Sequence, residues 1–250
     1  MLRRRIIPCL DVSGGRVVKG VEFVNLRDCG DPVDAAVRYA EQRADEIIWL
    51  NITASSESWR ALLEHVESAA ERVDIPVTVG GGVSRVEHVR ELLLAGADKV
   101  AINSAALRDP ALVERAAEAF GRQCVVVAID ARRSNGSWRV HLDGGRTPTD
   151  SDVIEWASEA AARGAGELLV TSMDADGGQS GYDTELLQRI AERVEVPVIA
   201  SGGAGRPEDL ADALAAGAEA ALAASIFHDG THTIEEVKAA CSARGFAMRT

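Results

Sequence analysis

The chain has 250 residues, of which 46% are hydrophobic, and a formal net charge of −12 at pH 7. This length fits one large α/β domain, and the acidity argues against a nucleic-acid or anionic-membrane partner, because either needs a basic patch. No apolar run approaches the roughly 20 residues that span a bilayer and the N-terminus lacks the apolar segment of a signal peptide, so we expect a cytoplasmic protein.

Short apolar segments alternate with helical patterns along the chain. In the first half, strands are expected near residues 5–11 and 46–51, with helices near 31–43 and 57–73 and a long loop before the first helix. Two further strands of this half flank a helix after residue 75. In the second half, strands are expected near residues 123–130, 167–172, 197–201 and 219–224.

The two halves repeat one another. Residues 75–98 (IPVTVGGGVSRVEHVRELLLAGAD) align without a gap with residues 196–219 (VPVIASGGAGRPEDLADALAAGAE). Eight strands alternating with helices predict a parallel sheet, and two tandem four-strand halves favour closure. We therefore predict an α/β fold in which residues 1–250 form a single (β/α)8 TIM barrel, built from half-barrels of about 1–120 and 121–250. An open doubly wound sheet is the alternative.

Two aspartates end the first strand of each half, Asp11 and Asp130. Active sites of such barrels lie at the C-terminal ends of the strands, and the period-two alternation puts both carboxylates on inward faces. The two strands stand opposite each other in an eight-stranded barrel. A general acid and a general base on opposite sides of one substrate would fit this pattern. The alternative is that each aspartate only caps the following loop.

Glycine segments follow the third and seventh strands, and hydroxyl-bearing turns follow the fourth and eighth. Such segments bring backbone N–H groups and helix N-termini close to an anion. A matched pair predicts two phosphate sites and hence a substrate with a phosphate at each end, the alternative being tight turns without a ligand. The residues expected at these sites are Gly82, Asn103, Ser104, Gly203, Ala224 and Ser225.

Two more segments are expected to contact the substrate. Residues 174–181 superficially resemble a calcium loop but lack its terminal glutamate, so we interpret them as a substrate-contacting loop. The expected substrate-binding residues at this edge are Thr171, Asp176 and Gly177. The long loop of residues 12–30 is a candidate lid that could carry the charge of Lys19 to the substrate.

Four charged residues fall at the opposite end of the barrel, at or near strand starts: Arg5, Glu46, Lys99 and Glu167. A mutually paired ring of charges there can be satisfied. On these residues alone, a plug of the barrel is the better interpretation, and a gate is the alternative. Lys238, in a polar helix near the end, has no evident role. The four cysteines and five histidines lack metal-ligand spacing, so we expect no metal and no cofactor.

The chain resembles the cyclase subunit of imidazole glycerol phosphate synthase, from histidine biosynthesis, over essentially its whole length. The segments that carry the resemblance are RIIPCLDV (5–12), GRVVKG (15–20), NLRD (25–28), TVGGG (78–82), GADKV (96–100), VVVAIDA (125–131), ASGGAG (200–205) and AALAASIFH (220–228). The sister isomerase of the same pathway differs at PCLD (8–11) and RVVKG (16–20).

The resemblance implies a lyase whose ammonia comes from a glutaminase subunit docked at the barrel bottom. It implies as substrate a phosphoribulosyl-formimino aminoimidazole carboxamide ribotide, and as products imidazole glycerol phosphate and aminoimidazole carboxamide ribotide. Asp11 and Asp130 match the acid/base pair of the family. The four bottom charges match its ammonia gate, which favours a gate over a plug, and Asp98 matches a docking position for the glutaminase.

One position departs from the family. Where its members usually have aspartate after the second strand, this chain has Asn51, which cannot carry charge or take a proton. The position therefore either only supports the site or marks a specialised paralogue. An isomerase-like barrel acting on another phosphorylated ribotide, and a binding barrel without turnover, are further alternatives.

Overall fold

The computed structural model describes residues 3–21, 24–53 and 56–249, and the side chains of residues 19–27 and 56–57 lie outside this description. Eight parallel strands form a closed ring, because β12 pairs with β1. The ring strands are β1 (Arg5–Ser13), β4 (Ile47–Asn51), β5 (Val77–Gly80), β6 (Lys99–Ile102), β7 (Val125–Ser134), β10 (Glu167–Ser172), β11 (Val198–Ser201) and β12 (Ala220–Ala223). The predicted (β/α)8 barrel is confirmed.

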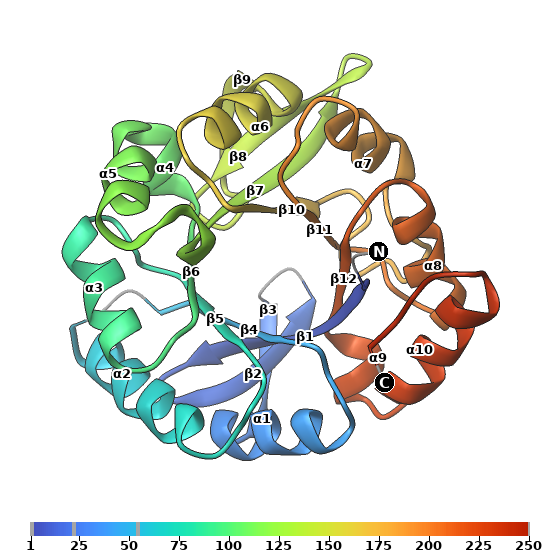
Figure 1. Cartoon of the computed structure of the whole chain (residues 1–250), viewed down its shortest axis with the longest axis horizontal. Helices are drawn as coiled ribbons and strands as arrows, with labels where there is room; N and C mark the ends of the chain where they lie inside the picture. The colour runs from blue at the N-terminus through green and yellow to red at the C-terminus, as the bar shows by residue number, and fades with distance from the viewer. Residues whose placement is uncertain (1–2, 22–23, 54–55, 250) are drawn as a thin grey trace.

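Helices surround the ring and follow its strands along the chain (Figure 1). The longer ones are α1 (Pro32–Glu41), α2 (Ser56–Ala70), α3 (Val86–Leu94), α5 (Ala111–Phe120), α6 (Val153–Ala162), α7 (Thr184–Ala191), α8 (Pro207–Ala215) and α10 (Ile234–Ala243). Two short helices, α4 (Ser104–Arg108) and α9 (Ser225–His228), follow the fourth and eighth ring strands, and a 3-10 turn spans Arg122–Cys124. Among the described residues, no helix is long and apolar enough to cross a membrane.

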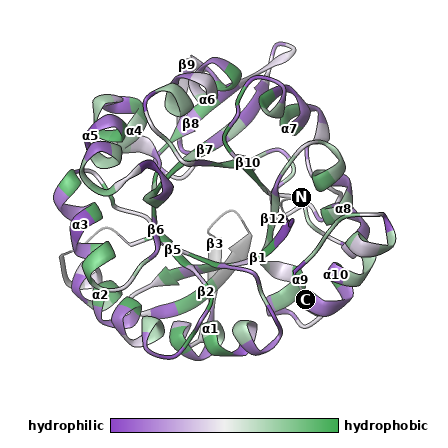
Figure 2. Cartoon of the chain, in the orientation of Figure 1, coloured by the Kyte–Doolittle hydropathy of each residue, from purple (hydrophilic) through white to green (hydrophobic). Residues whose placement is uncertain are grey.

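Strand alternation divides the core into two layers. One face of each strand packs against the apolar faces of the helices, while the helix surfaces that face solvent are hydrophilic (Figure 2). The other face fills the barrel interior with a second apolar cluster, in which Ile7, Cys9 and Val126 are buried. The predicted inward parity is therefore confirmed for Ile7 and Cys9 of β1 and for Val126 of β7.

Antiparallel hairpins extend the first strand of each half. β2 (Arg16–Val21) pairs with β1 and with β3 (Val24–Gly30), so the expectation of a long loop over residues 12–30 is wrong. β8 (Ser137–Leu142) pairs with β7 and with β9 (Thr147–Asp152), in a segment to which the sequence analysis assigned no element. Its turn, Asn135-Gly136, has φ values of 50° and 81° at its two residues, as a tight hairpin turn requires.

Lys238 of α10 binds the segment between α1 and β4, so the expectation that it has no evident role is wrong. Its ammonium lies 2.8 Å from Asp45 Oδ1 and 2.6 Å from the carbonyl oxygen of Arg43. The second carboxylate oxygen of Asp45 accepts from the Ile6 N–H at 2.8 Å. Because Lys238 and Asp45 are both buried, loss of either would leave an unpaired charge in the core, which is strongly destabilising.

Candidate functional site at the barrel mouth

Asp130 lies on the inward face of β7, near the mouth of the barrel. It is partly buried, and the Asn103 side-chain amide donates to its Oδ2 at 3.1 Å. Burial raises the pKa of Asp130 and the negative charge of Asp176 adds to this, although the Asn103 hydrogen bond and His141 oppose it. A carboxyl group that keeps its proton to higher pH suits a general acid.

Asp11 occupies the equivalent place on β1. It stands opposite Val18 of β2 and Leu50 of β4 in the sheet register. Three ring strands separate β1 from β7 on each side of the barrel, so the two aspartates belong to opposite walls. The structure thus brings both predicted residues to the mouth, and a substrate between them could exchange protons with either.

The first expected phosphate corner lies beside Asp130, where Asn103 precedes α4 and Ser104 begins it. The Ser104 hydroxyl accepts from the Asp143 N–H at 2.8 Å. Gly81 has φ of 92°, and a Cβ there would lie only 1.9 Å from the Asn51 carbonyl oxygen, so only glycine fits. At Gly82 a Cβ would meet no heavy atom within 4 Å, which leaves its backbone open to a ligand.

The second expected corner lies on the other side, where Ala224 precedes α9 and Ser225 begins it. Gly203 closes this corner against the loop after β10, because a Cβ there would lie 2.1 Å from the carbonyl oxygen of Gly181. The first residues of a helix have N–H groups without intrahelical partners. Each corner therefore offers backbone donors to an anion at matched places of the two halves.

His228 ties α9 to the strand of Asp11. Its Nε2 lies 2.9 Å from the Cys9 carbonyl oxygen, and its Nδ1 lies 2.7 Å from the Tyr39 hydroxyl. Because a carbonyl only accepts, Nε2 must donate, and the neutral ring then accepts the Tyr39 proton at Nδ1. Cys9 comes two residues before Asp11, so these hydrogen bonds link the second expected corner to the strand of Asp11. The sequence analysis missed them.

The loop after β10 borders Asp130. Thr171 stands opposite Asp130 in the sheet register, and the exposed Asp176 is close enough to raise the pKa of Asp130. Gly177 has φ of 72° in the same loop. Asp174 fixes the loop to β7 by accepting from the Arg133 N–H at 2.6 Å. The expected substrate residues of this edge therefore lie beside the aspartate.

Two expectations have other outcomes. The side chain of Lys19 lies outside the described residues, although its backbone belongs to β2. Asn51 is only 7% exposed, and its Oδ1 accepts from the Thr53 N–H at 3.2 Å. An aspartate at position 51 would accept the same hydrogen bond, so replacing aspartate by asparagine leaves this contact unchanged.

The four expected bottom charges form one closed network. Arg5 lies 2.7 Å from Glu46 and 3.1 Å from Glu167, and Lys99 lies 2.9 and 3.1 Å from the same two carboxylates. Burial by itself would raise the pKa of Glu46, but the charges of Lys99 and Arg5 outweigh it, so this pKa is lowered. Burial likewise opposes the charge on Arg5, yet the two glutamates raise the Arg5 pKa. Glu46 and Arg5 are thus held ionised by their partners in the network.

Asp98, the expected docking residue, is exposed next to this network. Its Oδ2 accepts from the Val77 N–H at 2.9 Å. The matched residue of the second half, Glu219, accepts from the Val198 N–H at the same distance. Each carboxylate therefore binds the first residue of the preceding strand, β5 for Asp98 and β11 for Glu219. Asp98 uses only one of its oxygens in this hydrogen bond.

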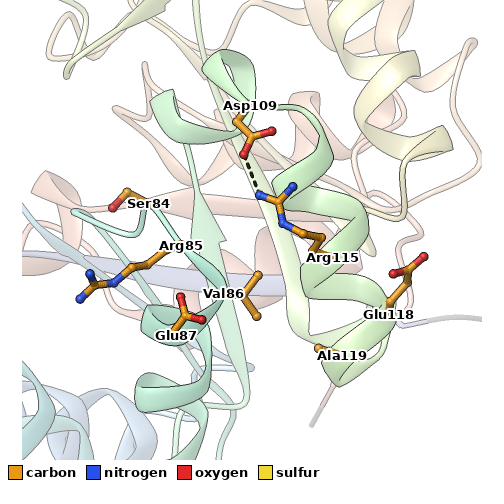
Figure 3. A pocket seen from close by; sticks show the side chains of 8 residues that line it. All are labelled: Ser84, Arg85, Val86, Glu87, Asp109, Arg115, Glu118 and Ala119. Carbon is orange, nitrogen blue, oxygen red and sulfur yellow. Dashed lines mark hydrogen bonds and ion pairs between the residues drawn. The ribbon is translucent and has the colours of Figure 1, made fainter.

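A surface groove lies away from the barrel mouth. It runs between α3 and α5 and is lined by charged side chains, among them Arg85, Glu87 and Glu118 (Figure 3). Asp109 and Arg115 form an ion pair of 2.6 Å across part of it. None of the residues expected at the mouth lines this groove, so it does not belong to the candidate site.

The sequence analysis also missed His141. It stands directly opposite Asp130 in the β7–β8 pairing and is only 8% exposed. Asn-Gly between alternating segments is a strong hairpin signal, and residues 134–137 (SNGS) carry it. Extending the strand of Asp130 through that turn would have brought His141 back to the mouth.

Comparison with known proteins identifies the family of the chain. Residues 5–233 match the family model described as histidine biosynthesis protein. Three relatives are each named imidazole glycerol phosphate synthase subunit HisF. The protein of Dehalococcoides mccartyi (strain BAV1) is 54% identical over 100% of this chain and 99% of its own. That of Symbiobacterium thermophilum is 58% identical over the same shares, and that of Synechocystis sp. is 56% identical over 99% and 97%. The chain belongs to the histidine biosynthesis protein family.

Proposed function

We propose that this chain is the cyclase subunit of imidazole glycerol phosphate synthase. In this role it would be a lyase that uses ammonia to convert phosphoribulosyl-formimino aminoimidazole carboxamide ribotide. The products would be imidazole glycerol phosphate and aminoimidazole carboxamide ribotide. The full-length similarity to proteins of that name supports the proposal, and the placement of Asp11 and Asp130 on opposite walls of the mouth carries it.

The mouth suits a substrate with two phosphates. The corner at Ser104 and the corner at Ser225 each begin a short helix, and helix N-termini bind anions. A substrate held at both ends would place its reacting centre between the two aspartates. Asp130, whose pKa is raised, is suited to give a proton, and Asp11 to take one.

The bottom network suits an ammonia entrance. Arg5, Glu46, Lys99 and Glu167 lie at the N-terminal ends of the strands, and an apolar interior separates them from the mouth. We propose that a glutaminase subunit docks at this face, with Asp98 as one of its contacts, and that the four charges gate the passage of ammonia. The word subunit in the names of the relatives supports a partner.

The proposal extends to organisation and location. We propose half-barrels of about 1–120 and 121–250, a division supported by the aligned segments and by the hairpin that follows the first strand of each half. We also propose a cytoplasmic location. A specialised paralogue or an isomerase-like barrel is the second candidate, because Asn51 departs from the family.

The test supplies the purified chain with the ribotide and ammonium at alkaline pH and follows the loss of substrate absorbance. We expect turnover in the parent, and a loss of about 100-fold or more in Asp11→Asn and in Asp130→Asn, which is what removal of a general acid or base costs. Glu159→Gln, on the outer helix α6, is the control and should keep full activity. Substrate binding without turnover would favour the paralogue.

A further inference from the structure

The β7–β8 hairpin fixes the side of the sheet on which His141 lies. Trp138 and Val140 of β8 are buried in the outer core with Val153 of α6. Since side chains alternate along a strand, the other face of β8 carries Arg139 and His141. Trp138 Nε1 also donates to Asp183 Oδ2 at 2.8 Å, which anchors the hairpin to the N-terminus of α7.

His141 therefore shares a face with Asp130. The two residues are directly opposite each other in an antiparallel pair, where side chains lie on the same face and their Cβ atoms are about 5 Å apart. The charge of His141 also acts on Asp130, opposing the rise of its pKa.

One nitrogen of His141 is already committed. Its Nδ1 lies 3.0 Å from the Gly145 carbonyl oxygen, and because a carbonyl only accepts, Nδ1 must donate. The neutral ring therefore has its lone pair on Nε2, and this nitrogen takes up or releases the second proton. Asp143 holds the turn that contains Gly145, because the Asp143 N–H donates to the Ser104 hydroxyl.

The remaining charges near His141 are mostly paired among themselves. Arg108 of α4 binds Asp143 at 2.7 Å. On the strand pair beyond His141, Arg132 lies 3.8 Å from Asp174, and Arg139 donates to the Asp150 carbonyl oxygen at 2.9 Å. In the turn, Arg146 acts on Asp143. From the loop after β10, Asp176 acts on Asp130.

We propose that His141 is a positioning residue for Asp130, whose imidazole faces this carboxyl across the β7–β8 pair and whose positive charge favours the carboxylate form of Asp130. The consequence for catalysis rests on the proposed cyclase function, but the coupling between the two groups does not. An imidazolium favours the ionised carboxylate. Without it, Asp130 keeps its proton to higher pH.

The first test needs no turnover. The side-chain carboxyl carbons of aspartate are labelled with 13C, and the Asp130 signal, assigned by its loss in Asp130→Asn, is titrated by NMR. In His141→Gln and His141→Phe the midpoint should move to higher pH than in the parent. His88→Gln, on α3, is the matched control and should not move it. An unchanged midpoint in both His141 variants would overturn the proposal.

A second measurement covers variants that fail to fold. Coupling is reciprocal, so in Asp130→Asn the 15N titration of His141 Nε2 should move to lower pH. In an active enzyme, the limb of the kcat/KM profile that Asp130 controls should move to higher pH in His141→Gln, changing kcat/KM at pH 6 by about threefold. If the parent shows no turnover, the proposed function fails, while the two titrations still decide the role of His141.

Discussion

The two halves of the barrel share a backbone plan but hold their short helices by different contacts. Asn103, just before α4, donates directly to Asp130 at 3.1 Å. The matched residue before α9 is Ala224, which has no side-chain donor. There the helix is held from its other end, by His228 on the Cys9 carbonyl oxygen at 2.9 Å. Both halves thus connect a short helix to the neighbouring aspartate strand, and only the chemistry of the connection differs.

The bottom of the barrel shows the same pattern. Glu46 and Glu167 are matched in sequence and both bind Arg5 and Lys99. The side chain of Glu46 is only 2% exposed and also accepts from the Thr78 hydroxyl at 2.6 Å, whereas that of Glu167 is 14% exposed. Duplicated positions keep their place in the fold while burial makes one of them structurally more important.

Unequal burial predicts unequal losses of stability at the bottom. Glu46→Gln should lower the free energy of unfolding by about 3 kcal/mol, because it leaves two buried cations short of charge. Glu167→Gln should cost about 1 kcal/mol, since water reaches this side chain. Urea unfolding at pH 7 measures both. Equal losses would mean that the two glutamates are equivalent despite their different exposure.

The contact between Asn103 and Asp130 can be broken at the mouth. Asn103→Ala should lower kcat about tenfold, since a hydrogen bond to a charged group contributes about 1.5–3 kcal/mol and part of it acts in the transition state. Because this hydrogen bond lowers the pKa of Asp130, its loss should also move the Asp130 titration to higher pH. Ser104→Ala is the neighbouring control, which should raise KM and leave kcat nearly unchanged.

The hydrogen bonds that join Tyr39, His228 and the Cys9 carbonyl oxygen predict a smaller effect on stability and on KM. Tyr39→Phe removes the hydroxyl that His228 accepts from, and should cost about 1 kcal/mol of stability together with a rise of a few-fold in KM. Tyr182→Phe is the matched control, because this buried hydroxyl donates to the Leu222 carbonyl oxygen at 2.8 Å. It should cost similar stability without changing KM. A similar KM in both variants would argue that the hydrogen bond between Tyr39 and His228 is purely structural.

The smallest effect is expected at Asn51. Aspartate there would keep the hydrogen bond from Thr53, and both rim aspartates are already present. Asn51→Asp should therefore change kcat/KM by less than about threefold, well below what a general acid or base contributes. Steady-state kinetics with ammonium measure it. A gain of orders of magnitude would show that this position does more than support the site.

Much of this architecture could be predicted from local patterns. Apolar segments alternating with helical patterns predicted eight strands, and the repeat of the two halves predicted their closure. Period-two alternation placed Asp11 and Asp130 on the inner wall. Asp176 and Thr171 followed from their position at one strand end. These predictions work because each depends on a periodicity or a motif that short stretches of chain contain.

The missed features depend on contacts that a local pattern does not contain. Lys238 meets Asp45, a residue 193 positions away, and no periodicity connects them. His228 meets Tyr39, which is 189 positions away. His141 is different, because the Asn135-Gly136 turn was a readable signal that the sequence analysis did not use. The hairpin it begins is what returns this imidazole to Asp130.

The hydrogen bonds between the two ends of the described chain make a circular permutant of the protein feasible. The Arg4 N–H donates to the Ala247 carbonyl oxygen at 2.8 Å, and Lys238 binds that of Arg249. Because Arg4 directly precedes the start of β1, the first and last described residues lie together at the face opposite the mouth. A short linker could join them, and new ends could be opened at the exposed Asn135-Gly136 turn. Such a circular permutant would free the lower face of the barrel from any tag that a fusion at the native ends would place there.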